Sequence, residues 1–239
     1  MRTLEMVTVK LVADPYPPYQ FEENGRIIGV DHDVITESLK VHGILAETSL
    51  YGWDECMAMM ANGKADGIFQ ITRTPERTRR FLFSERLRTA STLFFKRDGF
   101  EIDLDGAAQL VTRLRKLKIG VLSGYSYGPA IDSLSDSCKV ERESSEGLLN
   151  GLLQDEFSLA LMDHGVAAYL MKRMHIKGID SAQGYGIPRA LYVAFQKDIS
   201  ALAHHFNSGL REIKESGVYG EIFRRYSLSP NKRGVQSCY

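Results

Sequence analysis

Residues 62–77, NGKADGIFQITRTPER, hold a complete transition from a strand to a helix. The run at residues 65–69 is apolar and follows an Asn-Gly turn, so it predicts a buried strand. Thr74 and Pro75 then fit the first positions of a helix, with threonine as the N-cap and proline as the first helical residue. A strand that is followed at once by a helix is typical of α/β proteins.

The same alternation continues through most of the chain. Two extended apolar runs, at residues 91–96 and 191–195, separate one series of strands and helices from another. We therefore expect two α/β lobes that are joined by two hinge strands, with a cleft between the lobes. The expected lobes are residues 1–95 with 193–239, and residues 96–192.

Individual elements follow from the same patterns. Leu202, Phe206, Leu210 and Ile213 recur at helical spacing and predict one face of a long helix. The other expected helices are residues 33–41, 54–61, 126–134, 146–153, 165–174 and 219–226. The expected strands are residues 7–13, 27–30, 46–51, 65–69, 118–122, 139–141 and 159–162.

Composition and charge exclude several classes of protein. Of the 239 residues, 44% are hydrophobic and 25% are charged, and thirty Lys and Arg balance thirty Asp and Glu. These values are typical of a globular protein and argue against extensive disorder. A nucleic-acid-binding protein usually carries a basic surplus, so we expect no nucleic-acid partner. The apolar runs are also far shorter than the roughly 20 residues that span a bilayer.

The cysteines and the N-terminus leave the cellular compartment open. Cys56, Cys138 and Cys238 are scattered, lack C-x-x-C spacing and allow one disulfide at most. The first residues enter a strand pattern at once and lack the apolar core, roughly 7–15 residues long, of a secretion signal. On this evidence the protein is either cytoplasmic or has lost a signal peptide.

One motif admits an enzymatic interpretation. Residues 124–128, GYSYG, match the G-x-S-x-G pattern of serine hydrolases and lie between an expected strand and an expected helix. Ser126 would be the nucleophile of an esterase, and acidic and histidine partners follow it at Asp163, His164, His175 and His204. The alternative is a turn in which the glycines allow tight geometry and Ser126 caps the helix. A pattern of five residues with two glycines is weak evidence, and we favour the turn.

Metal and nucleotide sites have less support. The segments DHD at residues 31–33 and HH at residues 204–205 contain metal-ligand types, but adjacent helical residues point in different directions. The methionines near Cys56 are more typical of core packing than of metal binding. Neither GxGxxG nor GxxxxGK[ST], the two nucleotide-binding motifs, occurs. We expect neither a metal nor a cofactor.

Polar groups gather where expected strands pass into helices. Thr72 and Arg77 flank a helix start, where free backbone N–H groups and the helix dipole favour an anion. A guanidinium there can bind a carboxylate through two charge-assisted hydrogen bonds. Residues 123–126, SGYS, form a second loop of this kind, and Asp163 ends an expected strand, where it can accept from an ammonium group. The plainer alternatives are that Arg77 pairs with a neighbouring glutamate and that Asp163 only caps the helix after it.

The order of seven short motifs carries a family resemblance. They are YPPY at 16–19, GVDHD at 29–33, GKADG at 63–67, TPER at 74–77, KIGVLSG at 118–124, ALMD at 160–163 and GVYGEI at 217–222. Together they resemble the class 3 extracellular solute-binding proteins, which are the polar amino-acid receptors of ABC importers. The resemblance spans nearly the whole chain, and its specificity lies in the order and spacing of the motifs.

This resemblance implies the type II periplasmic-binding-protein fold, in which two α/β lobes close on a ligand by hinge bending. It implies that Arg77 binds the α-carboxylate of the ligand, together with Thr72 and the backbone of Ser126. Asp163 would bind the α-ammonium group. The side chains expected around the side chain of the ligand are Tyr16, Trp53 and Asp14.

Three positions depart from the pattern of the family. Gln70 and Tyr125 stand where smaller residues are usual, so they would narrow the site or change the ligand. Arg73 replaces an apolar residue, and it either points away or recognises an additional acidic group. We count Gln70 and Tyr125 among the expected ligand-binding residues, and Asp14 and Arg73 as further candidates for the pocket.

The leading hypothesis is a receptor that captures a small polar, amino-acid-like solute and delivers it to a membrane permease. The resemblance places such a receptor in the periplasm or outside the cell, and it is not expected to be an enzyme. The main alternative is that the same module is the sensing domain of a membrane signalling receptor, such as a histidine kinase. An esterase that uses Ser126, or a dehydratase on the same scaffold, is less favoured.

Overall fold

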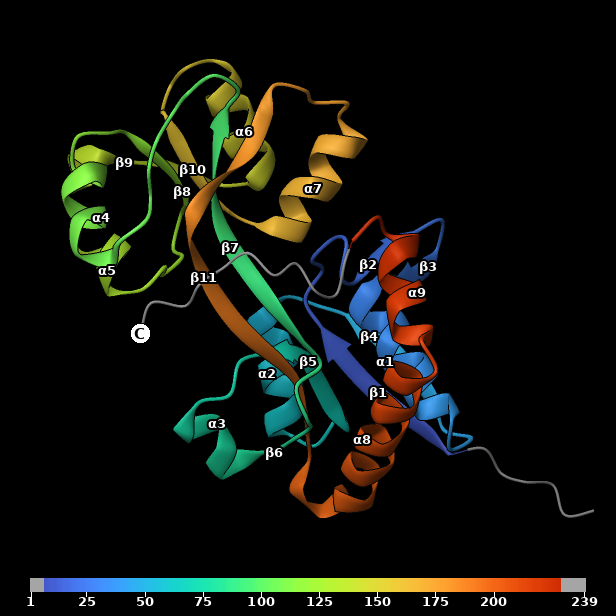
Figure 1. Cartoon of the computed structure of the whole chain (residues 1–239). Helices are drawn as coiled ribbons and strands as arrows, with labels where there is room; N and C mark the ends of the chain where they lie inside the picture. Colours follow the sequence, from blue (N-terminus) through green and yellow to red (C-terminus); the bar gives the residue numbers. More distant parts are fainter. Residues whose placement is uncertain (1–6, 229–239) are drawn as a thin grey trace, which may run out of the picture. The chain divides into compact units, whose positions relative to one another are not determined.

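The computed structural model of the chain describes residues 7–228. Strands and helices alternate along this range, which confirms the α/β class (Figure 1). The described residues divide into two compact units, of which the first contains residues 7–89 and 190–228 and the second residues 90–189. The chain passes between the units twice, once within β7 (Arg88–Arg97) and once within β11 (Ile179–Phe195).

The first unit contains strands in the order β4-β1-β5-β11, with β6 beside β11. Strand β1 (Thr8–Ala13) pairs in parallel with β4 (Leu45–Leu50) and with β5 (Gly67–Ile71), whereas β11 runs antiparallel to β5. Its other elements are β2 (Phe21–Glu23), β3 (Arg26–Ile28), α1 (Val30–Lys40), α2 (Trp53–Ala61), α3 (Pro75–Arg80), β6 (Leu82–Phe83), η2 (Lys197–Ile199), α8 (Ser200–Glu215) and α9 (Val218–Arg225).

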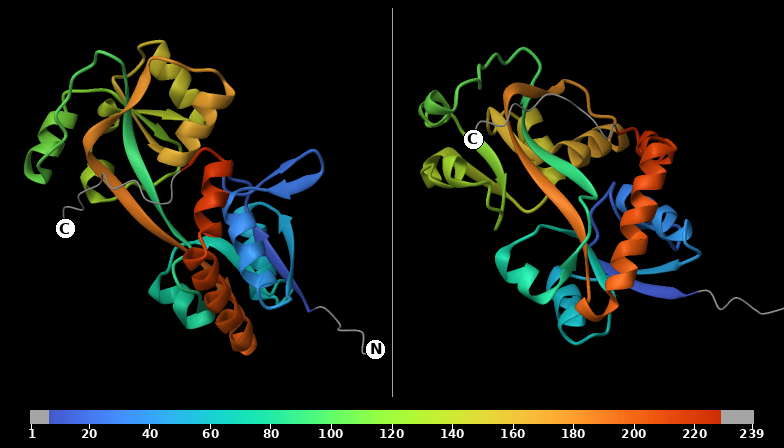
Figure 2. Two further views of the ribbon diagram at one scale, coloured as in Figure 1. Left: turned by 45° about the vertical axis from the view of Figure 1, so that its right-hand side comes forward. Right: turned by 60° about the horizontal axis from the view of Figure 1, so that its bottom comes forward.

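Helices α1 and α8 of the first unit lie side by side, as both views of Figure 2 show. Helix α8 buries the face that the sequence predicted, made of Leu202, Phe206, Leu210 and Ile213. The helices approach closely at Gly209, where an added Cβ atom would lie 1.9 Å from the backbone oxygen of Ser38. This contact therefore requires the absence of a side chain at residue 209.

The second unit contains strands in the order β7-β10-β8-β9. Strand β10 (Leu159–Asp163) runs antiparallel to β7 and parallel to β8 (Ile119–Leu122), which in turn is parallel to β9 (Lys139–Arg142). Its helices are α4 (Ala107–Leu114), α5 (Pro129–Asp132), η1 (Asp136–Cys138), α6 (Ser145–Leu153) and α7 (His164–Arg173). Its core is apolar and includes Phe94, Leu110, Ile119, Ile131 and Leu161.

Several predicted boundaries are wrong. The helix expected at residues 126–134 is limited to α5, because Gly128 has a φ of 91°, outside the helical region, and Pro129 follows it as the first helical residue. The run at 191–195 is only the end of the 17-residue β11. Helix α4, whose Leu110 and Leu114 are spaced by four and buried, was not predicted.

A buried ion pair attaches the start of β7 to α1. The Nε atom of Arg88 lies 2.6 Å from Oδ1 of Asp31, and the two side chains are only 3% and 1% exposed. The Arg88 guanidinium also lies over the ring of Tyr19, 3.4 Å from its centroid. Asp31, which the sequence offered as a metal-ligand type, therefore belongs to an ion pair.

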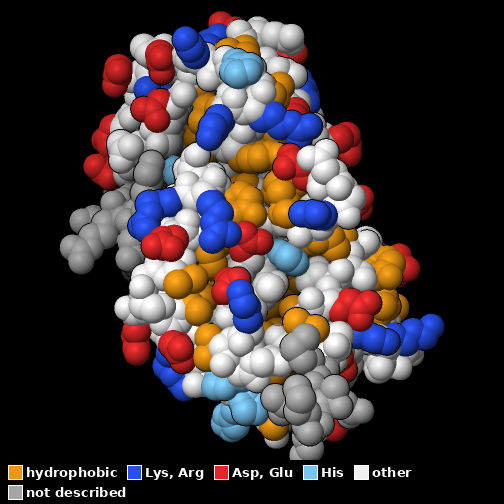
Figure 3. All heavy atoms as spheres, turned by 90° about the vertical axis from the view of Figure 1, so that its right-hand side faces the viewer, with side chains coloured by type: hydrophobic (Ala, Val, Ile, Leu, Met, Phe, Trp, Pro, Cys, Tyr) orange, Lys and Arg blue, Asp and Glu red, His pale blue; other side chains and the backbone are white. Residues whose placement is uncertain are grey.

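One face of the molecule mixes charges of both signs. On the face in Figure 3, Lys and Arg side chains are interspersed with Asp and Glu, in keeping with their equal numbers in the sequence. Among residues 7–228, the helices are too short or too polar for any of them to cross a membrane.

Candidate functional site

In the first unit, the expected ligand-binding residues lie at one edge of the sheet. Strands β4, β1 and β5 are parallel, so their carboxyl ends lie at the same edge. Asp14 and Tyr16 follow β1, Trp53 begins α2 just after β4, and Thr72 follows β5. Ligands of open α/β sheets bind at this kind of edge.

Arg77 is held in place at this edge by its neighbours. Its Nη1 atom donates to Oγ1 of Thr72 at 2.8 Å and to the backbone oxygen of Thr72 at 3.1 Å. The guanidinium lies over the Trp53 ring, 5.3 Å from the ring centroid. The side chain is half-buried and forms no ion pair within residues 7–228, so the expected alternative of a glutamate partner is wrong. A half-buried cation that is oriented in this way can bind an anionic group.

Helix α3 begins as the sequence predicted, but it is too short to contribute much to anion binding. The Oγ1 atom of Thr74 accepts the backbone N–H of Arg77 at 3.2 Å, so Thr74 is the N-cap and Pro75 the first helical residue, as predicted. The helix has only six residues, and its dipole is correspondingly small. The capacity to bind an anion therefore rests on the Arg77 guanidinium.

Gln70 occupies a β-bulge that the sequence did not predict. Ile71 is opposite Tyr192 and Phe69 is opposite Val193, so Gln70 is an additional residue in β5. Its φ angle of 57° lies in the left-handed region, which is unusual for a residue other than glycine. Bulges are frequent next to binding sites, where they redirect a side chain.

Gln20 is part of this edge and was missed by the sequence reasoning. It is fully buried, and its Nε2 atom donates to the backbone oxygen of Asp14 at 2.9 Å and to Oε1 of Gln70. A signal was present in the sequence, because a lone amide between the aromatic residues Tyr19 and Phe21 has to find hydrogen-bond partners if it is buried.

The acidic and aromatic candidates of the first unit have distinct surroundings. Burial raises the pKa of the Asp14 carboxyl. The ring of Tyr16 stacks on that of Tyr19, with centroids 5.9 Å apart. Arg73 is exposed, and its guanidinium lies over Phe83, 5.9 Å from the ring centroid.

In the second unit, Asp163 ends β10 and is buried, with 5% of the residue exposed. Its Oδ1 atom accepts the backbone N–H groups of Gly165 at 2.9 Å and Val166 at 3.2 Å. Asp163 is thus the N-cap of α7, which is the plainer role that the sequence suggested. Because β8 is parallel to β10, residues 123–126 follow β8 at the same edge of this sheet.

Ser126 binds the carboxylate of the last residue of α5, Asp132. Its Oγ atom donates to Oδ2 of Asp132 at 2.6 Å, and this bond is the main reason that the pKa of Asp132 is lowered. Ser126 is not the N-cap of α5, which is Gly128. The neighbouring Tyr125 is 47% exposed. The hydroxyl of Ser126 is therefore bonded to an aspartate, not to a histidine.

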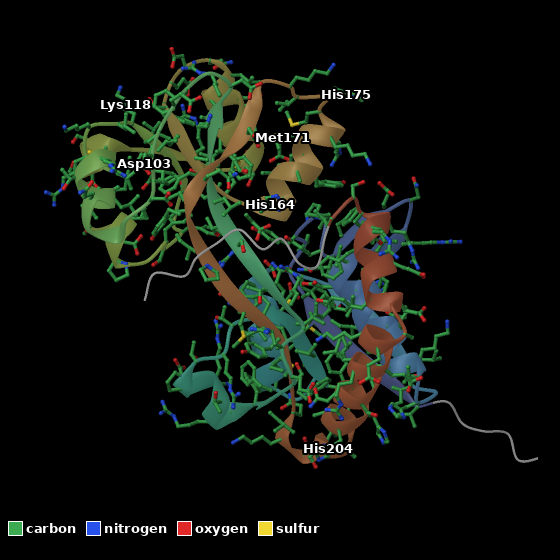
Figure 4. All side chains as sticks on the ribbon, viewed as in Figure 1. Asp103, Lys118, His164, Met171, His175 and His204 are labelled. Atoms are coloured by element: carbon green, nitrogen blue, oxygen red, sulfur yellow. The ribbon has the colours of Figure 1, made fainter. Side chains whose placement is uncertain are left out.

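The histidines considered for a hydrolase have other positions. His164 is the first residue of α7, His175 follows the end of that helix, and His204 lies on α8 (Figure 4). Among residues 7–228, groups of three His, Cys, Asp or Glu that could hold a metal ion do not occur. Cys56 and Cys138 are buried free thiols, and Cys238 lies outside the described residues.

Comparison with known proteins identifies relatives along most of the chain. The sequence is 24% identical over 221 residues to the arginine-binding extracellular protein ArtP of Bacillus subtilis, a match that covers 88% of this chain and 82% of that protein. The fold is similar to that of the L-cystine solute receptor of Neisseria gonorrhoeae in its unliganded open conformation, with a TM-score of 0.77, 17% identity and 97% of each chain covered.

A histidine kinase sensor domain with similarity to periplasmic binding proteins also shares the fold, with a TM-score of 0.69, 19% identity, and 93% of this chain and 98% of that chain covered. The fold is therefore the type II periplasmic-binding-protein fold, as predicted. A model of the bacterial extracellular solute-binding proteins, family 3, matches residues 9–229, and the protein belongs to this family.

Proposed function

We propose that the protein is a receptor for a small polar, amino-acid-like solute and that it delivers this solute to an ABC-type permease. The observation that carries the proposal is Arg77, a half-buried guanidinium that Thr72 and Trp53 orient and that has no carboxylate partner within residues 7–228. Membership of the solute-binding family and the amino-acid-binding names of the relatives support the same function. The role is that of a binding protein, not of an enzyme.

In the bound state, Arg77 would bind the α-carboxylate of the ligand, with help from Thr72 and from the backbone of Ser126. Asp163 would bind the α-ammonium group. This combination matches a zwitterion, because one cation and one anion of the protein neutralise the two charges of the ligand. Aromatic and polar side chains would surround the side chain of the ligand: Tyr16, Trp53, Gln70 and Tyr125, with Asp14 and Arg73 as further candidates.

Capture and delivery would depend on a conformational change. Ligand contacts that are made by both units favour the closed form over the open one, and the permease would recognise the closed form. The proposed location is outside the cytoplasmic membrane, in the periplasm or at the cell surface. A dissociation constant of 1 μM corresponds to about −8 kcal/mol, which two charge clamps and aromatic burial can supply.

Isothermal titration calorimetry tests the proposal, after a thermal-shift screen of amino acids, polyamines and small carboxylates has identified ligands. Arg77→Ala and Asp163→Ala should each weaken amino-acid binding more than tenfold. Arg79→Ala is the matched control, since Arg79 is exposed on the same short helix and should leave the affinity unchanged. Full affinity in both clamp variants would contradict the proposed roles.

Ligand sensing within a signalling receptor is the second candidate, because the fold is shared with a histidine kinase sensor domain. The two roles predict different partners for the ligand-bound protein. A transport receptor should stimulate ATP hydrolysis by its permease in proteoliposomes, and only when ligand is present. A gene that continues into a transmembrane segment and a kinase domain would instead favour sensing.

A further inference from the structure

The buried amide of Gln20 fixes the orientation of the amide of Gln70. A backbone carbonyl only accepts hydrogen bonds, so the atom of Gln20 that contacts the oxygen of Asp14 must be its NH₂ group. The same Nε2 atom also donates to Gln70, and the atom that receives this bond must be Oε1 of Gln70. The two donors of Gln20 are thereby used, and the side chain of Gln70 cannot turn over without losing a bond.

The NH₂ group of Gln70 is consequently left available to a ligand. It has no hydrogen-bond partner in the part of the chain that the structure describes, and the Gln70 side chain is half-buried. The β-bulge determines the position of this side chain at the carboxyl end of β5, two residues before Thr72, which holds Arg77.

Asp14, which carries an acceptor group, is linked to Gln70 through Gln20. Asp14 supplies the carbonyl that anchors Gln20, and its own carboxyl group is half-buried at the same strand end. A ligand with a cationic side chain has no acceptor for the N–H groups of Gln70 and would leave them unpaired. A ligand with an anionic side chain would be repelled by the carboxylate of Asp14. A neutral group that has a carbonyl next to an N–H group satisfies both.

We infer that Gln70 is a specificity-determining residue and that the protein selects ligands with a neutral carboxamide or ureido side chain. The carbonyl oxygen of the ligand accepts from Nε2 of Gln70, and its N–H group donates to Asp14. Gln20 is a positioning residue, which acts through the amide of Gln70. This inference rests on the proposed function, since it takes Arg77 as the carboxylate clamp of the same ligand.

The test is a calorimetric comparison of glutamine, glutamate and ornithine, which differ mainly in the charge and hydrogen-bonding groups of the side chain. The wild-type protein should bind glutamine at least tenfold more tightly than either of the others. Gln70→Glu keeps the shape and the acceptor for Gln20 but presents an oxygen to the ligand. It should reduce the glutamine-to-ornithine affinity ratio at least tenfold. Gln154→Glu, which adds the same charge at an exposed position, should leave this ratio unchanged.

A second variant separates positioning from a general loss of structure. Gln20→Met removes both donors and frees the amide of Gln70 to turn over, so it should reduce the glutamine-to-ornithine ratio. A purely structural role of Gln20 would lower both affinities equally and leave the ratio intact. If Gln70→Glu does not fold, Gln70→Ala supplies the same test, with a loss of affinity for glutamine alone.

The outcomes distinguish this inference from the proposed function. Binding that depends on Arg77 but shows no preference for glutamine, or a preference that Gln70→Glu and Gln70→Ala both leave unchanged, would overturn the inference alone. Failure of any amino acid to bind would overturn the proposed function and the inference with it.

Discussion

The buried pair of Arg88 and Asp31 allows a quantitative prediction for Arg88→Met. The substitution keeps most of the length of the side chain but leaves Asp31 as a charge that is 1% exposed and has lost its guanidinium partner. Removal of one partner from a buried ion pair costs about 3–5 kcal/mol. For a chain of this size, 1 kcal/mol lowers the melting temperature by about 2–4 °C, so the expected decrease is roughly 6–20 °C.

Tryptophan fluorescence is a suitable assay, because Trp53 is the only tryptophan and lies in the first unit with the ion pair. Urea unfolding followed by this signal should show the loss in Arg88→Met and in Asp31→Leu. The double variant should recover much of the stability, because it leaves no buried charge alone. Arg211→Met, which removes an exposed pair with Glu85, should cost about 0–1 kcal/mol. A cost below about 1 kcal/mol for Arg88→Met, or a double variant whose loss equals the sum of the single losses, would refute the reasoning.

Three further predictions concern single residues. Burial raises the pKa of the Asp14 carboxyl, so the folded state binds the proton more tightly than the unfolded state. The free energy of unfolding therefore falls as the pH rises from the ordinary aspartate pKa of about 3.9 through the raised pKa of the folded state. In urea titrations, Asp14→Asn should be more stable than wild type at pH 7, and the difference should vanish below a pH of about 3.9. Gly209→Ala should reduce the free energy of unfolding by about 1–3 kcal/mol, because the added Cβ atom would clash with the backbone of α1. An unchanged free energy of unfolding in the same assay would contradict the close contact of the two helices. Burial raises the pKa of Cys56 to about 11, so a thiol reagent at pH 8 should label it only after unfolding, and rapid labelling of the native protein would show that the thiol is accessible.

Local patterns in the sequence were sufficient where one interaction dominates. The face of α8 follows from four apolar residues at helical spacing, and the start of α3 follows from Thr74 and Pro75. The position of Arg77 next to Thr72 also follows from the sequence, because both residues belong to one strand-to-helix connection.

Interactions between distant segments could not be predicted in this way. The pair of Arg88 and Asp31 joins residues 57 positions apart, and the contact of Gln20 with Gln70 joins residues 50 apart. The bulge at Gln70 depends on its pairing with β11, whose first twelve residues were not recognised as strand. The short α5 begins late because Gly128 has a φ of 91°, outside the helical region, and Pro129 follows it as the first helical residue.

The central claim is that the Arg77 guanidinium binds the α-carboxylate of the solute. It is tested most directly by calorimetry of wild type and Arg77→Ala with the amino acid that stabilises the protein most, and with the α-amide of the same amino acid, which lacks the carboxylate. We expect the wild type to lose at least tenfold in affinity for the α-amide, since each charge-assisted hydrogen bond contributes about 1.5–3 kcal/mol, and Arg77→Ala to bind both compounds equally weakly. An equal loss for the α-amide in wild type and in Arg77→Ala would show that the carboxylate is bound elsewhere.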